Sequence, residues 1–132
     1  MKIFITGVAG FLGSHLADLM ISQGHTVAGN DNMIGGYTDN VPQDVEFHQV
    51  DCCDLENLTK AMEGCDIVYH TAATAYEGLS VFSPVLVTRN IFEASVTTIT
   101  AAIRNKVKRI VYCSSMARYG HHDDVPYKET YE

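Results

Sequence analysis

The sequence predicts an α/β fold in which a doubly wound parallel sheet carries helices on both faces. Three observations lead to this expectation. The chain of 132 residues opens on a short apolar strand that runs directly into three evenly spaced glycines. Short apolar segments then alternate with segments of helical periodicity, which is typical of βαβ units. The second apolar segment ends in an acidic residue, as in the first unit of dinucleotide-binding folds.

The glycine-rich turn follows the strand Lys2–Thr6 and has the pattern G-x-x-G-x-x-G. Gly7 permits a tight turn from strand to helix, Gly10 lets the backbone approach a pyrophosphate, and Gly13 lets the helix pack closely on the sheet. The amide groups and the positive end of the helix dipole then face the anion. We therefore expect a dinucleotide to be bound at this turn by Gly7, Gly10, Phe11, Leu12 and Gly13.

The next helix and strand supply an acidic residue at the expected distance from the glycines. Apolar residues lie on one side of a helix that begins near Leu12 and that Gly24 ends, and the strand Thr26–Asn30 then leads into Asp31. A carboxylate at this place accepts hydrogen bonds from the adenosine ribose hydroxyls and repels a 2′-phosphate. We therefore expect NAD rather than NADP. The alternative is an acidic turn residue beside a purely structural glycine loop.

The remaining elements complete a five-stranded sheet. Residues Asn32–Asp44 form a loop rich in Gly, Asn and Asp, and Val45–Val50 is the third strand. Asp54–Met62 is a short crossover helix, capped by its first residue, and further strands begin at Ile67 and Arg109. Right-handed crossovers then give the strand order 3-2-1-4-5, with the cofactor across the point where the order reverses.

Three further strand ends carry a family resemblance. They read Asp51-Cys52, His70-Thr71-Ala72-Ala73 and Ser114-Ser115-x-x-x-Tyr119-Gly120. Together with the glycine turn, they resemble the extended short-chain dehydrogenase/reductase family, the NAD-dependent epimerases and dehydratases of nucleotide sugars. The resemblance implies a Rossmann fold in which Asp51 and the Cys52 backbone contact adenine, and in which Asn32 also touches the cofactor. It implies that Thr71, Ala72 and Ala73 pass close to the cofactor, and that Ser115 holds the substrate hydroxyl or carbonyl.

The helix before the fifth strand fits the family pattern less regularly. Ser83 and Pro84 form its N-cap and first turn, and Asn90 lies near the asparagine of the family motif N-x-x-G-T. Glu93 and Ala94 stand where the motif has glycine and threonine, and counting back from Val107 places the motif asparagine at residue 91. A one-residue insertion in the helix would reconcile the two counts, and the resemblance then implies that Asn90 contacts the cofactor.

Family members carry a Tyr-x-x-x-Lys pair beyond the active-site serine, in which the lysine lowers the pKa of the catalytic tyrosine. No tyrosine of this chain is followed by a lysine four positions later, and the sequence ends at Glu132. We therefore interpret residues 1–132 as a single, incomplete NAD-binding domain, ending before a sixth strand and a substrate domain. The full-length enzyme would exchange hydride between NAD and a sugar hydroxyl, and this chain alone would be inactive. Two alternatives stay open: a stand-alone NAD-binding or redox-sensing module, and a structural remnant that binds nothing.

The amino-acid composition limits the kinds of partner that we expect for this protein. The formal charge of −7 disfavours nucleic acid, and the basic residues 104–109 are expected to be a solvated helix end. No signal peptide and no apolar run long enough to span a bilayer are visible, so we expect a cytoplasmic protein without membrane contact. The four cysteines match no metal or disulfide pattern, and we expect reduced thiols and no metal, with His121–Asp124 a polar loop. The resemblance implies a homodimer formed through helices, including Pro84–Lys106.

Overall fold

The computed structural model describes residues 1–76, 78–120 and 126–130. A five-stranded parallel sheet forms its centre, in the order β3-β2-β1-β4-β5. The strands are β1 (Lys2–Thr6), β2 (Thr26–Asn30), β3 (Val45–His48), β4 (Ile67–His70) and β5 (Arg109–Tyr112). The predicted α/β class and strand order are both confirmed.

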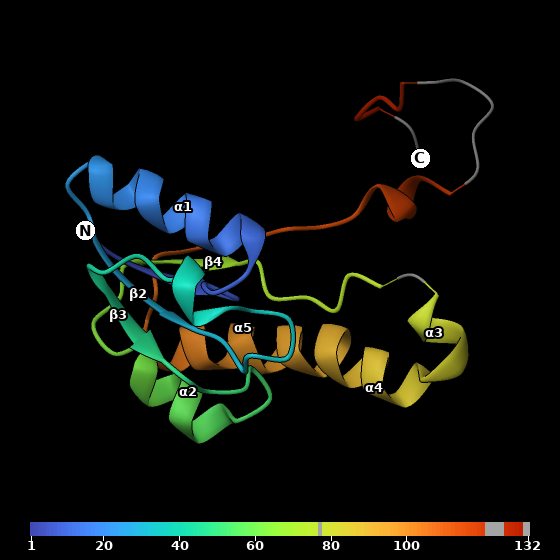
Figure 1. Cartoon of the computed structure of the whole chain (residues 1–132), viewed down its shortest axis with the longest axis horizontal. Helices are drawn as coiled ribbons and strands as arrows, with labels where there is room; N and C mark the ends of the chain where they lie inside the picture. Colours follow the sequence, from blue (N-terminus) through green and yellow to red (C-terminus); the bar gives the residue numbers. More distant parts are fainter. Residues whose placement is uncertain (77, 121–125, 131–132) are drawn as a thin grey trace.

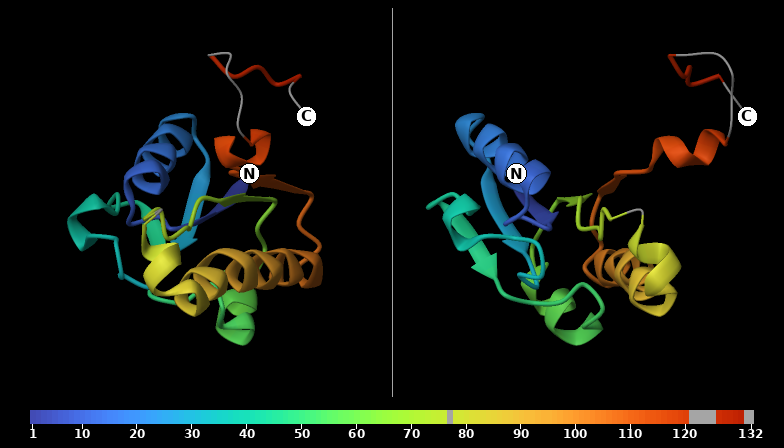
Figure 2. Two further views of the ribbon diagram at one scale, coloured as in Figure 1. Left: turned by 90° about the vertical axis from the view of Figure 1, so that its right-hand side faces the viewer. Right: turned by 45° about the vertical axis from the view of Figure 1, so that its right-hand side comes forward.

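Helices cover both faces of the sheet. Helix α1 lies on one face, and α2 and α5 lie on the other (Figure 1). The helices are α1 (Phe11–Ser22), α2 (Leu55–Ala61), α3 (Leu79–Phe82), α4 (Pro84–Thr88) and α5 (Ala94–Arg104). Single turns of 3-10 helix occur at η1 (Thr38–Asn40) and η3 (Met116–Tyr119), and η2 (Arg89–Glu93) is a π-helical turn between α4 and α5. The segment ending in η3 extends away from the sheet (Figure 2).

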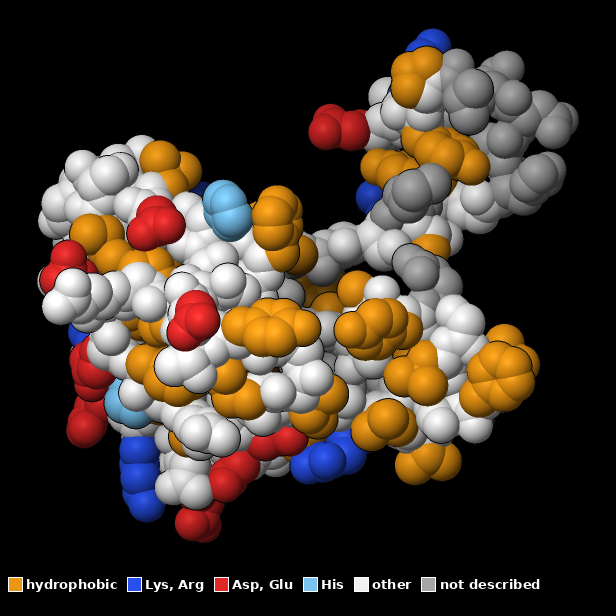
Figure 3. Space-filling view, viewed as in Figure 1, with side chains coloured by type: hydrophobic (Ala, Val, Ile, Leu, Met, Phe, Trp, Pro, Cys, Tyr) orange, Lys and Arg blue, Asp and Glu red, His pale blue; other side chains and the backbone are white. Residues whose placement is uncertain are grey.

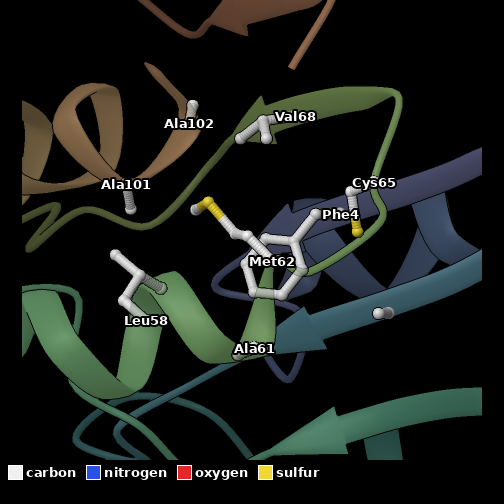
Figure 4. Close-up of a cluster of buried hydrophobic side chains, with 9 residues drawn as sticks. Phe4, Leu58, Ala61, Met62, Cys65, Val68, Ala101 and Ala102 are labelled. Carbon is white, nitrogen blue, oxygen red and sulfur yellow. The ribbon is translucent and has the colours of Figure 1, made fainter. Parts of the chain in front are cut away.

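The central strand β1 divides the core into two clusters because successive side chains of a strand point to opposite faces. Ile3 and Ile5 pack with Val8, Ala17, Met20 and Val27 beneath α1. Phe4 packs on the other face with side chains of α2, β4 and α5 (Figure 4). The central place of β1 puts the glycine turn that follows it in the middle of the carboxyl edge of the sheet.

The third strand is shorter than predicted, since it ends at His48 rather than Val50. The Val50 amide donates back to the His48 carbonyl, at 2.9 Å, which bends the chain away from the sheet. The Val50 carbonyl then accepts a hydrogen bond from the side chain of Asn30, at 2.8 Å, in place of a backbone partner on β2.

The predicted helix Pro84–Lys106 is interrupted. The π-turn at 89–93 separates α4 from α5, and the helix ends at Arg104, because Lys106 adopts a left-handed backbone with φ 54°. A π-turn accommodates one extra residue within a helix, and this turn contains Asn90. Ser83 is the N-cap of α4, but its side chain makes no capping bond with the residues that the structure describes. Asp54 does cap α2, through the Asn57 amide at 3.1 Å.

Strand β5 lies at one edge of the sheet. Val111 and Tyr112 on β5 are 37% and 51% exposed.

All four cysteines are free thiols: Cys52 and Cys65 are buried, Cys53 is half-buried and Cys113 is exposed. Among the described residues, no helix is long and apolar enough to cross a membrane, and no group of His, Cys, Asp and Glu could hold a metal. The segment His121–Asp124 lies outside the described residues.

Candidate functional site

A cavity of about 400 Å³ opens at the carboxyl ends of the strands, where the strand order reverses. Ligands of open α/β sheets bind at this place. The structure brings together around it every residue that the sequence assigned to the cofactor. These residues are Gly7, Gly10, Phe11, Leu12, Gly13, Asp31, Asn32, Asp51, Cys52, Thr71, Ala72, Ala73 and Asn90.

The glycine turn forms the floor of this cavity. Gly7 has φ +70°, and a Cβ there would lie 2.8 Å from the Cα of Ala72. A Cβ on Gly10 would approach only the Gly7 carbonyl oxygen, at 3.2 Å, and would otherwise enter open space. Helix α1 begins at Phe11, so the amides of its first turn have no acceptor within the helix. The turn therefore leaves room and free N–H groups for an anion.

Asp31 is held in place by two backbone amides. Its Oδ2 accepts a hydrogen bond from the Ala9 amide, at 3.2 Å, and its Oδ1 accepts one from the Met33 amide, at 2.8 Å. The residue is only 8% exposed and lines the cavity. Because each carboxylate oxygen accepts more than one hydrogen bond, Asp31 can also bind hydroxyl groups of a ligand.

A second carboxylate, Asp51, lies three residues beyond β3, beside Asn32 and Arg89. Its oxygens accept hydrogen bonds from the Cys53 amide, at 2.8 Å, and the Asn32 side chain, at 3.2 Å. Arg89 Nη2 lies 3.7 Å from Asp51 Oδ2. Partial burial alone would raise the pKa of Asp51, but these hydrogen bonds and the Arg89 charge outweigh it and lower the pKa. Asp51 is therefore a carboxylate at neutral pH.

The loop after β4 forms another part of the cavity wall. The Thr6 hydroxyl accepts hydrogen bonds from the amides of Thr71 and Ala72, at 3.2 and 3.1 Å. Asn90, on the π-turn, donates from Nδ2 to the Thr74 hydroxyl at 3.0 Å. Ala94 is buried and lines the cavity.

Ser115 lies at a different opening. A second cavity, of about 450 Å³, lies between the loop after β4 and the end of β5, and Ser115 lines it. The two cavities share the loop residues Thr71–Tyr76. The Ser115 hydroxyl accepts a hydrogen bond from the Ala117 amide, at 3.1 Å, and the residue is exposed. Its hydroxyl hydrogen is thus available to a molecule in the second cavity.

Sequence reasoning missed part of the first cavity's lining, namely Asn30, Ile34, Gly35, Gly36, Thr74, Ala75, Tyr76 and Ala94. The loop after β2 folds over the glycine turn, since the Tyr37 amide and the Asn40 side chain both donate to the Ala9 carbonyl. A Cβ on Gly36 would lie 2.9 Å from Asp31 Oδ2. The Gly35-Gly36 pair was therefore the one signal in the sequence that this loop approaches the site.

Known proteins resemble this chain in sequence and in structure. Residues 3–132 match the model of the NAD dependent epimerase/dehydratase family. The chain is 31% identical to a probable UDP-arabinose 4-epimerase 3 of Arabidopsis thaliana and 32% identical to a UDP-glucose 4-epimerase of Lacticaseibacillus casei. These matches cover 96% and 98% of this chain but 34% and 40% of the relatives, so the chain spans well under half of their length.

Solved structures agree with the sequence matches. The UDP-glucose 4-epimerase of Thermus thermophilus in complex with NAD has a TM-score of 0.91 and 32% identity, covering 99% of this chain and 43% of that chain. The enzyme from Stenotrophomonas maltophila, with bound NAD and formylated UDP-arabinopyranose, also has a TM-score of 0.91, with 27% identity over 98% of this chain and 41% of that chain. NAD is the cofactor of this family. By sequence, by fold and by the arrangement of its cavity, the chain belongs to the NAD dependent epimerase/dehydratase family.

Proposed function

We propose that this chain is the NAD-binding portion of an oxidoreductase resembling the nucleotide-sugar epimerases and dehydratases. One observation carries the proposal: the cavity joins the glycine turn and the free amides of α1 to Asp31 and Asp51 at the ends of two strands. NAD would supply a hydride acceptor for a sugar carbon. The relatives are named epimerases, which does not favour the alternative of a stand-alone sensing module.

The residues around the cavity fit the successive parts of NAD. Gly7, Gly10, Phe11, Leu12 and Gly13 would hold the pyrophosphate, because a side chain at Gly10 would occupy the open space that a phosphate needs. Asp31 and Asn32 would bind the adenosine ribose, and Asp51 and Cys52 the adenine. Thr71, Ala72 and Ala73 would let the dinucleotide pass close to the loop after β4, and Asn90 would contact it from the π-turn.

The second cavity is the proposed place of the reacting sugar. It adjoins the first through the shared loop, so a molecule there would lie beside one end of a bound dinucleotide. Ser115 would position the sugar oxygen by hydrogen bonding. The relatives' names point to UDP-sugars as the substrate class of the longer enzyme.

The proposed partner of the longer enzyme is a second copy of itself. Side chains 92, 96, 99 and 103 recur at helical spacing from the π-turn through α5, and Phe92, Val96 and Ile103 are 68%, 48% and 69% exposed. Exposed apolar side chains also gather around α3 and α4 (Figure 3). An apolar helix face of this kind is typical of an interface between subunits.

Calorimetric titration of this chain with NAD and with NADP tests the cofactor assignment directly. We expect saturable binding of NAD and weaker binding of NADP. Incubation with NAD and a panel of UDP-sugars, followed by the absorbance of reduced nicotinamide, should show no turnover. Ser115 has no Tyr-x-x-x-Lys pair in this sequence to assist it, and general acid-base catalysis typically contributes about 10²- to 10⁴-fold. Absence of NAD binding would refute the proposal.

A further inference from the structure

We propose that Ser95 is a positioning residue for the dinucleotide cavity, acting through a chain of hydrogen bonds that runs from Thr6 through His70 to the π-turn. The inference rests on the proposed NAD-binding function. It assigns a role to a histidine and a serine that line no part of the first cavity.

The chain of hydrogen bonds joins three elements of the fold. Thr6 Oγ1 on β1 lies 2.8 Å from His70 Nδ1 on β4, and His70 Nε2 lies 3.1 Å from Ser95 Oγ on α5. Ser95 Oγ in turn lies 2.6 Å from the carbonyl oxygen of Ile91, inside the π-turn. Thr6 and His70 are 0% and 3% exposed, so water does not compete strongly for the bond between them. The bonds of Ser95 are partly buried, and Ser95 lines the second cavity.

The surrounding contacts fix which atom donates in each bond. The Thr6 hydroxyl oxygen already accepts from the amides of Thr71 and Ala72, which occupies its two lone pairs. Its hydrogen must therefore be donated to His70 Nδ1, and that nitrogen carries no proton. The Ser95 hydroxyl donates to the Ile91 carbonyl, so it accepts from His70 Nε2–H. His70 is thus the neutral imidazole protonated at Nε2.

Desolvation supports the same protonation state, since burial lowers the pKa of His70. A protonated ring would carry a hydrogen on Nδ1 and would place a third donor against the Thr6 hydroxyl oxygen. These donor and acceptor roles in the hydrogen bonds from Thr6 through His70 to Ser95 therefore hold only while the imidazole is neutral.

Both ends of this chain of hydrogen bonds lie at walls of the first cavity. At one end, Thr6 holds the amides of Thr71 and Ala72. At the other, Ile91 follows Asn90, which lines the cavity and is hydrogen-bonded to Thr74 of the same loop. Ser95 therefore connects the position of the π-turn to the position of the loop that faces it. A π-turn inside a helix is frequently found at a functional site, and here its Ile91 carbonyl is held by a side chain.

Three variants test this connection. Ser95→Ala removes the hydroxyl, Ser95→Thr keeps it, and Thr100→Ala is the matched control. Thr100 lies on the same helix and makes the same type of bond, to the Val96 carbonyl at 2.8 Å, but this bond is exposed to solvent and Thr100 lines neither cavity. The readouts are NAD affinity by calorimetry, folding by circular dichroism, and the ring and amide nitrogen shifts in NMR spectra. We expect Ser95→Ala to weaken NAD binding roughly three- to tenfold, Ser95→Thr to restore it, and Thr100→Ala to leave it unchanged.

The NMR spectra test the proposed hydrogen bonds directly. In the unmodified chain without NAD, the His70 ring should show an unprotonated Nδ1 and a protonated Nε2. Ser95→Ala should shift the amides of Thr71 and Ala72, while Thr100→Ala should not. The inference is overturned if Nδ1 carries the proton, or if Ser95→Ala and Thr100→Ala bind NAD equally well. Failure of the unmodified chain to bind NAD would refute the proposed function, and the ring and amide shifts would still decide whether the chain of bonds exists.

Discussion

Gly13 packs so tightly on Gly7 that a Cβ at Gly13 would lie 2.1 Å from the Gly7 carbonyl oxygen. It would also lie 2.8 Å from the carbonyl carbon of Gly7 and 2.9 Å from the Cα of Val8. These atoms are backbone and cannot move aside as a flexible side chain can. The glycines of the turn therefore differ in what they do: Gly13 sets the packing of α1 on the turn, whereas Gly10 keeps space free above it.

Gly10→Val should abolish NAD binding while the chain stays folded. Gly10 has an extended backbone, φ −84° and ψ 174°, which a valine adopts without strain, and its added atoms would enter the open space of the cavity. Calorimetry gives the affinity and circular dichroism gives the fold. A folded Gly10→Val chain with unchanged NAD affinity would show that no pyrophosphate lies there.

Gly13→Ala should instead lower the free energy of unfolding, by about 1 to 3 kcal/mol, because overpacking forces the backbone to shift. Urea denaturation measures the change. Gly35→Ala is the control, since a Cβ on Gly35 would have no atom within 4 Å. Equal stability of the two variants would contradict the close packing of α1 on the turn.

Asp31→Ala should weaken NAD binding and narrow the preference for NAD over NADP. The loss of a charge-assisted hydrogen bond costs about 1.5 to 3 kcal/mol, on the order of ten- to a hundredfold in affinity. Because Asp31 also holds the amides of Ala9 and Met33, Asp31→Asn is needed beside it. The asparagine keeps one acceptor but removes the charge that would repel a 2′-phosphate. Equal affinities of the unmodified chain for NAD and NADP would refute this role.

Acid should destabilise the chain through His70. Burial lowers the pKa of His70 below its ordinary value of 6.5. As the pH falls through 6.5, the unfolded chain takes up a proton that the folded chain does not, so the free energy of unfolding decreases until the folded-state pKa is reached. The slope from this group is at most about 1.4 kcal/mol per pH unit, and it vanishes above the unfolded pKa. NMR titration of the ring checks the cause, and a His70 pKa at or above 6.5 would contradict it.

Val96→Lys should reduce self-association if the apolar face of α5 forms the subunit interface. A lysine in a desolvated interface would leave an unpaired charge. Leu19→Lys is the matched control, because Leu19 is 50% exposed on α1, which lies on the other face of the sheet from α5. Sedimentation velocity measures the oligomeric state. The interface assignment fails if Val96→Lys and the unmodified chain sediment alike as dimers.

The sequence was sufficient to predict the sheet order, and it also marked the residues at the strand ends that line the cavity, because both follow from local patterns. Glycine spacing marks the turn after β1, and Asp31 and Asp51 each follow directly on a strand end or its short continuation. Parallel strands place these ends on one edge. The residues of the loop after β2 that line the cavity were harder to predict. The approach of Gly36 to Asp31 depends on a loop without periodicity, whose path is set by its hydrogen bonds to Ala9.

The π-turn that interrupts the long helix could not be located by counting residues along the sequence. The two counts along this helix disagreed by one residue, but they could not locate an irregular turn, because a π-turn has no characteristic composition. The structure has the π-turn at 89–93. Likewise, nothing in the sequence joins Thr6, His70 and Ser95, which lie far apart along the chain and meet only once β1, β4 and α5 have packed.

The central place of β1 has a consequence for the order of folding. Of the five strands β1 is synthesised before the others, yet one of its edges pairs with β4, where Ile3 lies opposite Ile67. Until β4 has been made, Ile3, Phe4 and Ile5 have no complete sheet to enter, and such delayed, non-local pairing slows folding and exposes nascent chains to aggregation. The strand that carries the glycine turn is therefore made before its neighbours and is paired on its β4 side only after Ile67–His70 have been made.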